Sequence, residues 1–160
     1  MKAIYPGSFD PVTLGHLDII ERAARIVPQL VVAVLNNNQK DPLFSVQERV
    51  EHLQAITAHL PGVRVASFSG LLVDFAQAQQ AQTVVRGLRA TTDFEYEFQM
   101  ALTNRQLNQE LETIFIPTNL LYLYISSRTV KEIMAFGGDF SHMVPPLILD
   151  KIIAKQQTNS

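Results

Sequence analysis

Short apolar runs alternate along this chain with longer segments whose apolar residues recur at helical spacing. The run LVVAVL at residues 30–35 is apolar on both faces, as a central strand of a parallel sheet must be. This alternation predicts repeated strand–helix units, and their right-handed crossovers predict a parallel sheet flanked by helices. We therefore expect one doubly wound, Rossmann-like α/β domain over residues 1–160, with ligands at the carboxyl ends of its strands.

Turn residues and helix caps mark the ends of these units. Five strands are predicted, at residues 3–5, 30–35, 63–68, 83–86 and 113–116. Helices are predicted at residues 16–27, 45–60, 71–82, 92–110 and 146–155, with another that begins near residue 127. Ser45 and Glu48 form a capping box at the start of the second helix. The helix over residues 92–110 is expected to carry an apolar stripe made of Phe94, Phe98, Ala101 and Leu102.

Composition excludes several classes of protein. Hydrophobic residues make up 47% of the chain and charged residues 18%, which is typical of a globular protein rather than a disordered one. Cysteine is absent, so disulfides, thiolate metal sites and cysteine nucleophiles are excluded. The net charge is −2 and the basic residues are scattered, so no nucleic-acid partner is expected. Neither a signal peptide nor a membrane-spanning segment is recognisable, so we expect a cytoplasmic protein without a membrane partner.

The first predicted strand leads into a turn rich in glycine and proline at residues 5–11, followed by Thr-Leu-Gly-His at residues 13–16. Two glycines and two prolines fix a tight turn and let a ligand approach the backbone closely. The start of the next helix offers unpaired N–H groups and a partial positive charge, which favour phosphate oxygens. Ser8 and His16 add side-chain donors at the same place. The pattern favours a phosphate site over the alternative, an ordinary strand–helix loop in which His16 is a cap or an exposed residue.

The fourth predicted strand leads into Arg86, Gly87, Leu88 and Arg89. Planar guanidinium groups beside a glycine at the carboxyl end of a strand suit the recognition of phosphate. The alternative is a pair of surface arginines, but Arg86 directly continues an apolar run. Lys40 follows the second strand and would reach the same edge of the sheet, unless it is an ordinary solvated lysine.

Two further groups of residues leave alternatives open. Glu97 lies on the helix predicted over residues 92–110 and is either a solvated carboxylate or an acceptor for a ligand hydroxyl or amine. Ser126 and Ser127 precede a predicted helix with Arg128 alongside, so they are either helix caps or a second phosphate-binding helix start.

Histidines and aspartates form no pattern of metal ligands in the sequence. No companion at metal-ligand spacing accompanies His52, His59, His142, Asp10, Asp74 or Asp93. We therefore expect no metal ion held by protein side chains alone. The apolar residues 120–124 are explained equally well by a subunit contact and by core packing.

Four motifs, in this order, resemble those of the bacterial phosphopantetheine adenylyltransferases. They are Tyr5-Pro-Gly-Ser-Phe-Asp-Pro-Val-Thr-x-Gly-His16, Arg86-Gly-Leu-Arg-Ala90, Asp93-Phe-Glu-Tyr-Glu97 and Ile125-Ser-Ser-x-x-Val-Lys-Glu132. The similarity extends over nearly the whole chain, and is far more specific than Thr-x-Gly-His alone, which the wider nucleotidylyltransferase superfamily shares. The resemblance implies transfer of AMP from ATP to 4′-phosphopantetheine, giving dephospho-coenzyme A and pyrophosphate. It also implies Mg²⁺ as the cofactor and a homohexamer assembled as a dimer of trimers.

The same resemblance implies roles for individual residues. The catalytic residues would be His16, Lys40 and Arg89, with His16 stabilising the transition state at the α-phosphate. The acceptor would be bound by Ser8, Lys40, Leu72 and Arg86. ATP would be bound by Ser8, Phe9, His16, Gly87, Leu88, Arg89, Glu97, Tyr122, Leu123, Tyr124, Ile125, Ser126, Ser127 and Arg128. Ser8 departs from the family's threonine but keeps the hydroxyl, whereas Arg128 replaces the third serine of a Ser-Ser-Ser run and adds charge near ATP.

Such a reaction needs no nucleophile or general base from the protein. A phosphate monoester has a second pKa of about 6, so at neutral pH the acceptor is mostly a dianion that can attack directly. Positioning contributes about 7–11 kcal/mol and one preorganised donor about 2.7–4 kcal/mol. Three rival functions remain open: a sister nucleotidylyltransferase acting on nicotinate mononucleotide or glycerol phosphate, a non-catalytic adenine-nucleotide-binding module, and a plain flavodoxin-like binding domain.

Overall fold

Five strands form one parallel sheet in the computed structural model, which describes residues 1–37 and 41–159. The strands are β1 (Lys2–Gly7), β2 (Gln29–Leu35), β3 (Val63–Phe68), β4 (Thr83–Leu88) and β5 (Glu112–Pro117). Their order across the sheet is β3-β2-β1-β4-β5, and each neighbouring pair is parallel. The predicted doubly wound α/β fold is confirmed.

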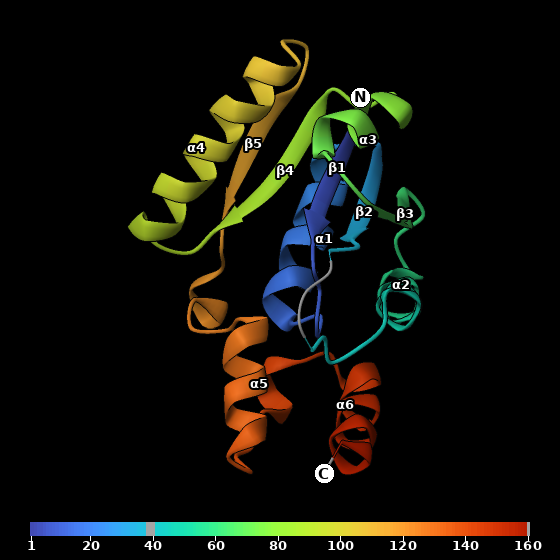
Figure 1. The fold of residues 1–160 in the computed structure, drawn as a ribbon, viewed down its shortest axis with the longest axis vertical. Coiled ribbons are helices and arrows are strands. Elements are labelled where there is room, and N and C mark those ends of the chain that lie inside the picture. Colours follow the sequence, from blue (N-terminus) through green and yellow to red (C-terminus); the bar gives the residue numbers. More distant parts are fainter. Residues whose placement is uncertain (38–40, 160) are drawn as a thin grey trace.

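Six α-helices flank this sheet in the described part of the chain. They are α1 (Leu14–Ile26), α2 (Val46–Thr57), α3 (Leu72–Ala78), α4 (Thr91–Leu107), α5 (Ser127–Ala135) and α6 (Pro146–Thr158). Two short 3₁₀-helices, η1 (Leu120–Tyr122) and η2 (Ser141–Met143), lie between β5 and α6. Figure 1 shows α5 and α6 beyond the carboxyl ends of the strands and α4 alongside β5. Of the helices in residues 1–37 and 41–159, none combines the length and apolar character required to cross a membrane.

The order of the strands reverses between β1 and β4, because β2 and β3 extend the sheet on one side and β5 extends it on the other. Within the described residues, β1 and β4 pair only at Ala3 with Thr83 and at Ile4 with Val84, so their carboxyl ends separate. A crevice at such a reversal is the usual place for a ligand in an open α/β sheet.

Two apolar clusters cover the two faces of the sheet. Along β1 the side chains alternate, so Tyr5 joins the cluster that contains α1 and α2 residues while Ile4 joins the one that contains α3 residues. The first cluster continues into the two C-terminal helices through Val130 and Ile148. Packing of α5 and α6 therefore depends on the same core that holds β1 and the start of α1.

Helix α3 ends four residues before the predicted position, so the prediction of helix to residue 82 was wrong. Gln80 adopts a left-handed conformation with φ 55°, and the N–H of Ala81 returns to the carbonyl of Ala76 at 2.9 Å. This geometry ends an α-helix. This helix end could not be predicted from the sequence, because a glutamine and not the usual glycine takes the left-handed position.

Helix α4 carries the predicted apolar stripe, yet the stripe is not buried. The exposed fractions are 47% for Phe98 and 54% for Leu102, and no described side chain of α4 is fully buried. Tyr96 and Met100 are exposed as well, so apolar side chains extend around the helix rather than along one face. Helical spacing predicted the stripe, but it could not tell whether the core of the same chain covers it.

Candidate active site

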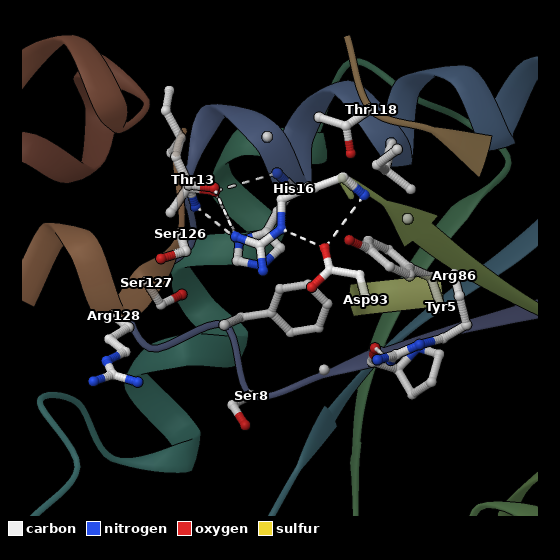
Figure 2. A pocket seen from close by; sticks show the side chains of 18 of the residues that line it. Tyr5, Ser8, Thr13, His16, Arg86, Asp93, Thr118, Ser126, Ser127 and Arg128 are labelled. Carbon is white, nitrogen blue, oxygen red and sulfur yellow. Dashed lines mark hydrogen bonds and ion pairs between the residues drawn. The ribbon is translucent and has the colours of Figure 1, made fainter. Parts of the chain in front are cut away.

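A cavity of about 340 Å³ lies where the strand order reverses, at the carboxyl ends of β1 and β4. The β1–α1 turn, the end of β4, the start of α4 and the start of α5 all contribute to its walls. Figure 2 shows the side chains of these separate segments around one space. The predicted site residues that line it are Ser8, Phe9, His16, Arg86, Gly87, Arg89, Glu97, Ile125, Ser126, Ser127 and Arg128. The fold thus brings together most of the residues singled out in the sequence.

His16 both caps α1 and lines this cavity. The hydroxyl of Thr13 accepts a hydrogen bond from the backbone N–H of His16 at 3.3 Å, and the backbone N–H of Thr13 donates to Nδ1 of His16 at 3.0 Å. These reciprocal bonds form a capping box, with histidine in the place that glutamate or glutamine usually takes. Capping and lining the cavity, which the sequence left as alternatives, occur together.

The bond from Thr13 fixes the tautomer of the His16 imidazole. A backbone N–H can only donate, so Nδ1 is unprotonated and the ring proton of the neutral form is on Nε2. Burial lowers the pKa of His16 to about 4, and the positive charges of Arg89 and Arg86 act in the same direction. At neutral pH the residue is therefore a neutral imidazole that offers an Nε2–H donor.

Phe9 supports the imidazole from the neighbouring turn. Its ring lies 5.0 Å from the ring of His16, centroid to centroid, at an interplanar angle of 70°. Phe9 adopts a left-handed conformation with φ 51°, which costs of order 1–3 kcal/mol for a residue other than glycine. A Cβ atom at Gly7 would lie 3.0 Å from the Phe9 ring, so glycine allows the ring to pack directly over the end of β1.

Arg86 forms a two-pronged ion pair with Glu97 in the wall of the cavity. Nε and Nη2 of Arg86 each lie 2.6 Å from a carboxylate oxygen of Glu97, and Nη1 donates to the carbonyl of Pro6 at 2.8 Å. Burial by itself lowers the pKa of Arg86, but the bonds to Glu97 outweigh it and raise the pKa above its ordinary value. Arg86 is thus a fixed cation, and the Glu97 carboxylate is already engaged.

Arg89 joins the start of α4 to the segment before α5. Its Nε lies 3.0 Å from a carboxylate oxygen of Asp93, and its Nη1 donates to the carbonyl of Ile125 at 3.3 Å. These contacts hold a second guanidinium in the wall of the cavity, close enough to His16 to lower the pKa of that imidazole.

The start of α5 supplies hydroxyl groups. Ser126 caps the helix, since its hydroxyl accepts the N–H of Thr129 at 3.0 Å. The hydroxyl of Ser127 donates to the carbonyl of Pro11 at 2.7 Å and so links α5 to the β1–α1 turn. The side chain of Arg128 is 88% exposed and pairs with Glu132 at 3.0 Å. Both serines act as structural contacts while they line the cavity.

A second cavity, of about 420 Å³, adjoins the first at a shared wall. The residues common to both are Pro6, Gly7, Ser8, Arg86 and Glu97. Leu72, predicted to contact the acceptor, lines only this second cavity. Most of its other walls are apolar side chains, among them Leu35, Phe68, Leu71 and Met100.

Some predicted site residues lie elsewhere. Lys40 falls outside the described residues. The walls of the first cavity do not include Leu88, Tyr122, Leu123 or Tyr124. Conversely, eight residues that do line it were not predicted as site residues, namely Tyr5, Pro6, Gly7, Thr13, Gly15, Ile19, Asp93 and Thr118. Two of these were detectable, because Thr13 has capping-box spacing to His16 and Asp93 lies four residues after Arg89.

The charges of the cavity suit an anion. Its walls contain three arginines and two carboxylates, and each carboxylate is paired with an arginine. Residues 1–37 and 41–159 contain no group of three or more His, Asp, Glu or Cys that could hold a metal ion. The first cavity therefore offers fixed cations, a neutral imidazole donor and hydroxyls, which together suit a phosphate-bearing ligand.

Comparisons with known proteins are consistent with this site. The chain matches the cytidylyltransferase-like family model over residues 4–133. It is 54% identical over 153 residues to the phosphopantetheine adenylyltransferase of Heliobacterium modesticaldum, covering 96% of this chain and 91% of the relative. The enzyme of that name from a Nostoc species is 56% identical over 148 residues, covering 92% and 78%. The nicotinic acid mononucleotide adenylyltransferase of Plasmodium falciparum, complexed with NaAD, shares the fold with a TM-score of 0.71 at 15% identity, covering 96% of each chain.

Proposed function

The chain belongs to the phosphopantetheine adenylyltransferase family, and from this premise we propose that it transfers the adenylyl group of ATP to 4′-phosphopantetheine. The products are dephospho-coenzyme A and pyrophosphate, so the reaction is a step of coenzyme A biosynthesis. The observation that carries the proposal is the wall shared by a cationic cavity and an apolar one, with Arg86 in that wall. This pair of cavities suits a nucleotide beside an acceptor that combines a phosphate with an apolar arm.

In the proposed reaction an oxygen of the acceptor phosphate attacks the α-phosphorus of ATP. The new P–O bond forms as the bond from the α-phosphorus to the bridging oxygen of the β-phosphate breaks, and pyrophosphate leaves with that electron pair. Because the acceptor is mostly a dianion above a pH of about 6, no protein base has to remove a proton. His16 donates Nε2–H to a non-bridging oxygen of the α-phosphate, where negative charge develops.

The proposal assigns the other residues by the cavity that they line and by the family pattern. The acceptor is bound by Ser8, Arg86, Leu72 and Lys40, so its phosphate competes with Glu97 for the guanidinium of Arg86. Arg89 and Lys40 assist His16 in stabilising the reacting phosphates. The remaining contacts to ATP come from Phe9, Gly87, Leu88, Glu97, Tyr122, Leu123, Tyr124, Ile125, Ser126, Ser127 and Arg128.

The proposed cofactor, Mg²⁺, has no set of ligands ready in the described part of the cavity. The carboxylates of Asp93 and Glu97 are engaged by Arg89 and Arg86. Mg²⁺ commonly keeps several waters and binds substrate phosphates, so we assign the ion to the nucleotide, as part of the substrate. When bound, the ion would neutralise negative charge on the triphosphate. The roles of the protein residues do not depend on it.

The proposed assembly is a homohexamer, and the proposed location is the cytoplasm. Support for assembly comes from the exposed apolar side chains of α4 and from Leu120 and Leu121 in η1, which are 81% and 70% exposed. An apolar surface of this kind is typical of a protein–protein contact. Light scattering after size-exclusion chromatography should give the mass of six chains, and the mass of one chain would contradict the assembly.

The test of the proposed function is a direct assay of the purified chain. Incubation with ATP, Mg²⁺ and 4′-phosphopantetheine should give dephospho-coenzyme A by mass analysis and an equal amount of pyrophosphate. Nicotinate mononucleotide and glycerol phosphate serve as parallel acceptors, because the rival nucleotidylyltransferases would use them. Product from either of these instead would replace the proposed substrate, and ATP binding without pyrophosphate from any acceptor would favour a non-catalytic module.

A further inference from the structure

Two buried charged residues, Asp10 and Arg49, hold the turn between β1 and α1 in place, although neither lines the first or the second cavity. Only 2% of Asp10 and 3% of Arg49 is exposed. The Asp10 carboxylate accepts the backbone N–H groups of Leu43 at 2.9 Å and Phe44 at 2.8 Å. The Arg49 guanidinium donates to the carbonyls of Ser8 at 2.8 Å and Phe44 at 3.1 Å. Together these bonds fasten the turn to the segment before α2.

The two anchored residues of the turn, Ser8 and Asp10, lie on either side of Phe9 in the chain. Arg49 holds the carbonyl of the preceding residue, and Asp10 is the residue that follows. A left-handed phenylalanine persists only where its surroundings over-determine the backbone, and the two anchors provide that constraint. The result is a Phe9 ring held edge to face with both Tyr5, at 5.4 Å, and His16, at 5.0 Å.

The same turn is also tied to α5. The hydroxyl of Ser127 donates to the carbonyl of Pro11 at 2.7 Å, and Nζ of Lys131 lies 3.6 Å from the Asp10 carboxylate. The turn is therefore held from β1, from the segment before α2 and from α5. A buried carboxylate destabilises the fold unless hydrogen bonds satisfy its oxygens. Replacement of Asp10 would leave the backbone N–H groups of Leu43 and Phe44 without the acceptors they now have, so it should disturb the turn.

We propose that Asp10 and Arg49 are positioning residues, which fix the Ser8–Phe9 turn so that the Phe9 ring holds the His16 imidazole in the geometry needed for transfer. The inference rests on the proposed function, because adenylyl transfer is the rate that it affects. Since neither side chain lines the first or the second cavity, both would act through the turn and not on a substrate.

The first test is Asp10→Asn, which puts an amide NH₂ where an oxygen accepts a backbone N–H. We expect kcat at saturating substrates to fall at least tenfold, while the KM for ATP changes less than threefold. The matched control is Glu48→Gln, because the Glu48 carboxylate also accepts a backbone N–H, from Ser45 at 2.7 Å, but at the start of α2. The control should keep kcat within twofold when all variants are assayed well below their melting temperatures.

A double-mutant cycle separates positioning from general damage. If Asp10 acts through His16, then Asp10→Asn should lower kcat less than threefold further once His16→Ala is present. A full tenfold loss in both backgrounds would overturn the proposal, because it would mean that Asp10 acts independently of His16. If Asp10→Asn does not fold, Arg49→Lys provides the same cycle, since lysine keeps the charge but cannot reach two carbonyls with a planar fork.

An NMR measurement keeps this inference distinct from the proposed function. The imidazole of His16 should titrate with a pKa near 4 in the wild-type chain and with a higher pKa in Asp10→Asn, because a loosened turn admits water. If this change occurs but the wild type transfers no adenylyl group, the proposed function fails and the positioning inference stands. If transfer occurs but neither variant alters the His16 resonances, the positioning inference is wrong.

Discussion

The two cavities share a wall but differ in chemistry. The first contains His16, three arginines and the serines of α5, whereas the second contains Leu35, Phe68, Leu71 and Leu72. Among the described residues that line the second cavity, the charged side chains are the two that both cavities share, Arg86 and Glu97. The fold thus concentrates its fixed charges at the crevice between β1 and β4 and on that wall, and leaves the neighbouring cavity apolar.

This difference indicates that the first cavity stabilises the reacting phosphates and that the second contributes affinity for the acceptor. Charge stabilisation needs preorganised donors, and the structure provides them in the first cavity. An apolar arm gains affinity from burial, for which the second cavity is suited. Residues of the first cavity should therefore control kcat, residues of the second should control KM for the acceptor, and the shared wall should control how tightly the acceptor phosphate is held.

The largest effect is expected from His16→Ala. Removal of one preorganised donor from a developing negative charge typically costs about 100-fold to 1,000-fold in kcat. We expect a loss in this range, with the affinity for ATP in titration calorimetry changed less than about threefold. His59→Ala is the control, because His59 is exposed and contacts Glu21 far from either cavity. Near-normal turnover of His16→Ala would mean that the imidazole has no role in the reaction, and it would contradict the expectation that residues of the first cavity control kcat.

The next effect concerns the shared wall. Arg86→Ala should weaken acceptor binding by about 10-fold to 100-fold, because hydrogen bonds to charged groups contribute about 1.5–3 kcal/mol each. The single variant leaves Glu97 without its partner, so Arg86→Ala combined with Glu97→Gln tests whether that carboxylate repels the phosphate. Calorimetry with the acceptor measures both, and Arg105→Ala, an exposed arginine of α4, is the control. An unchanged acceptor affinity would contradict the role of Arg86.

A smaller effect is expected in the apolar cavity. Leu72→Ala removes apolar contact from its wall and should raise the KM for the acceptor about threefold to tenfold, with kcat within twofold. The control is Leu147→Ala, an exposed leucine that lines neither cavity. Steady-state kinetics with each substrate varied in turn would check this prediction. A fall in kcat as large as the rise in KM would contradict the expectation that the second cavity affects only binding of the acceptor.

Local features of this site could be predicted from the sequence because their signals are local. Pro6 and Gly7 marked the carboxyl end of β1, although the strand includes both residues, and the motif Thr-Leu-Gly-His marked the start of α1 beside the crevice. Parallel topology then required that the turn after β1 approach Arg86 and Arg89, since all of these lie at the carboxyl ends of strands. The five strands and the meeting of Ser8, His16, Arg86 and Arg89 followed from these rules.

Contacts between distant segments could not be predicted in the same way. Nothing in the local sequence pairs Asp10 with Leu43 and Phe44, or Arg49 with Ser8, because these bonds depend on how two loops pack. The sequence left Glu97 as either a solvated carboxylate or an acceptor for a ligand, and neither alternative included its ion pair with Arg86 eleven positions away. Periodicity likewise defined the stripe of α4 without showing that the chain itself leaves it exposed.

The smallest effect is expected from protonation of His16, and it tests the chemical state of the first cavity. With a pKa of about 4, His16 is still about nine-tenths neutral at pH 5, so its protonation should add less than a twofold fall in kcat between pH 8 and pH 5 to the fall caused by protonation of the acceptor phosphate below a pH of about 6. Protonation of His16 affects the stability of the fold in the direction opposite to that of a histidine paired with a carboxylate. The unfolded chain, in which the pKa of His16 is near 6.5, binds the proton more readily than the folded chain does. His16 therefore makes the free energy of unfolding fall as the pH drops from about 6.5 towards 4. An NMR titration of His16 in parallel with kcat checks the first statement, and chemical denaturation at each pH checks the second. A pKa near 6.5 would mean that the imidazole is solvated and that the charges of Arg86 and Arg89 do not act on it.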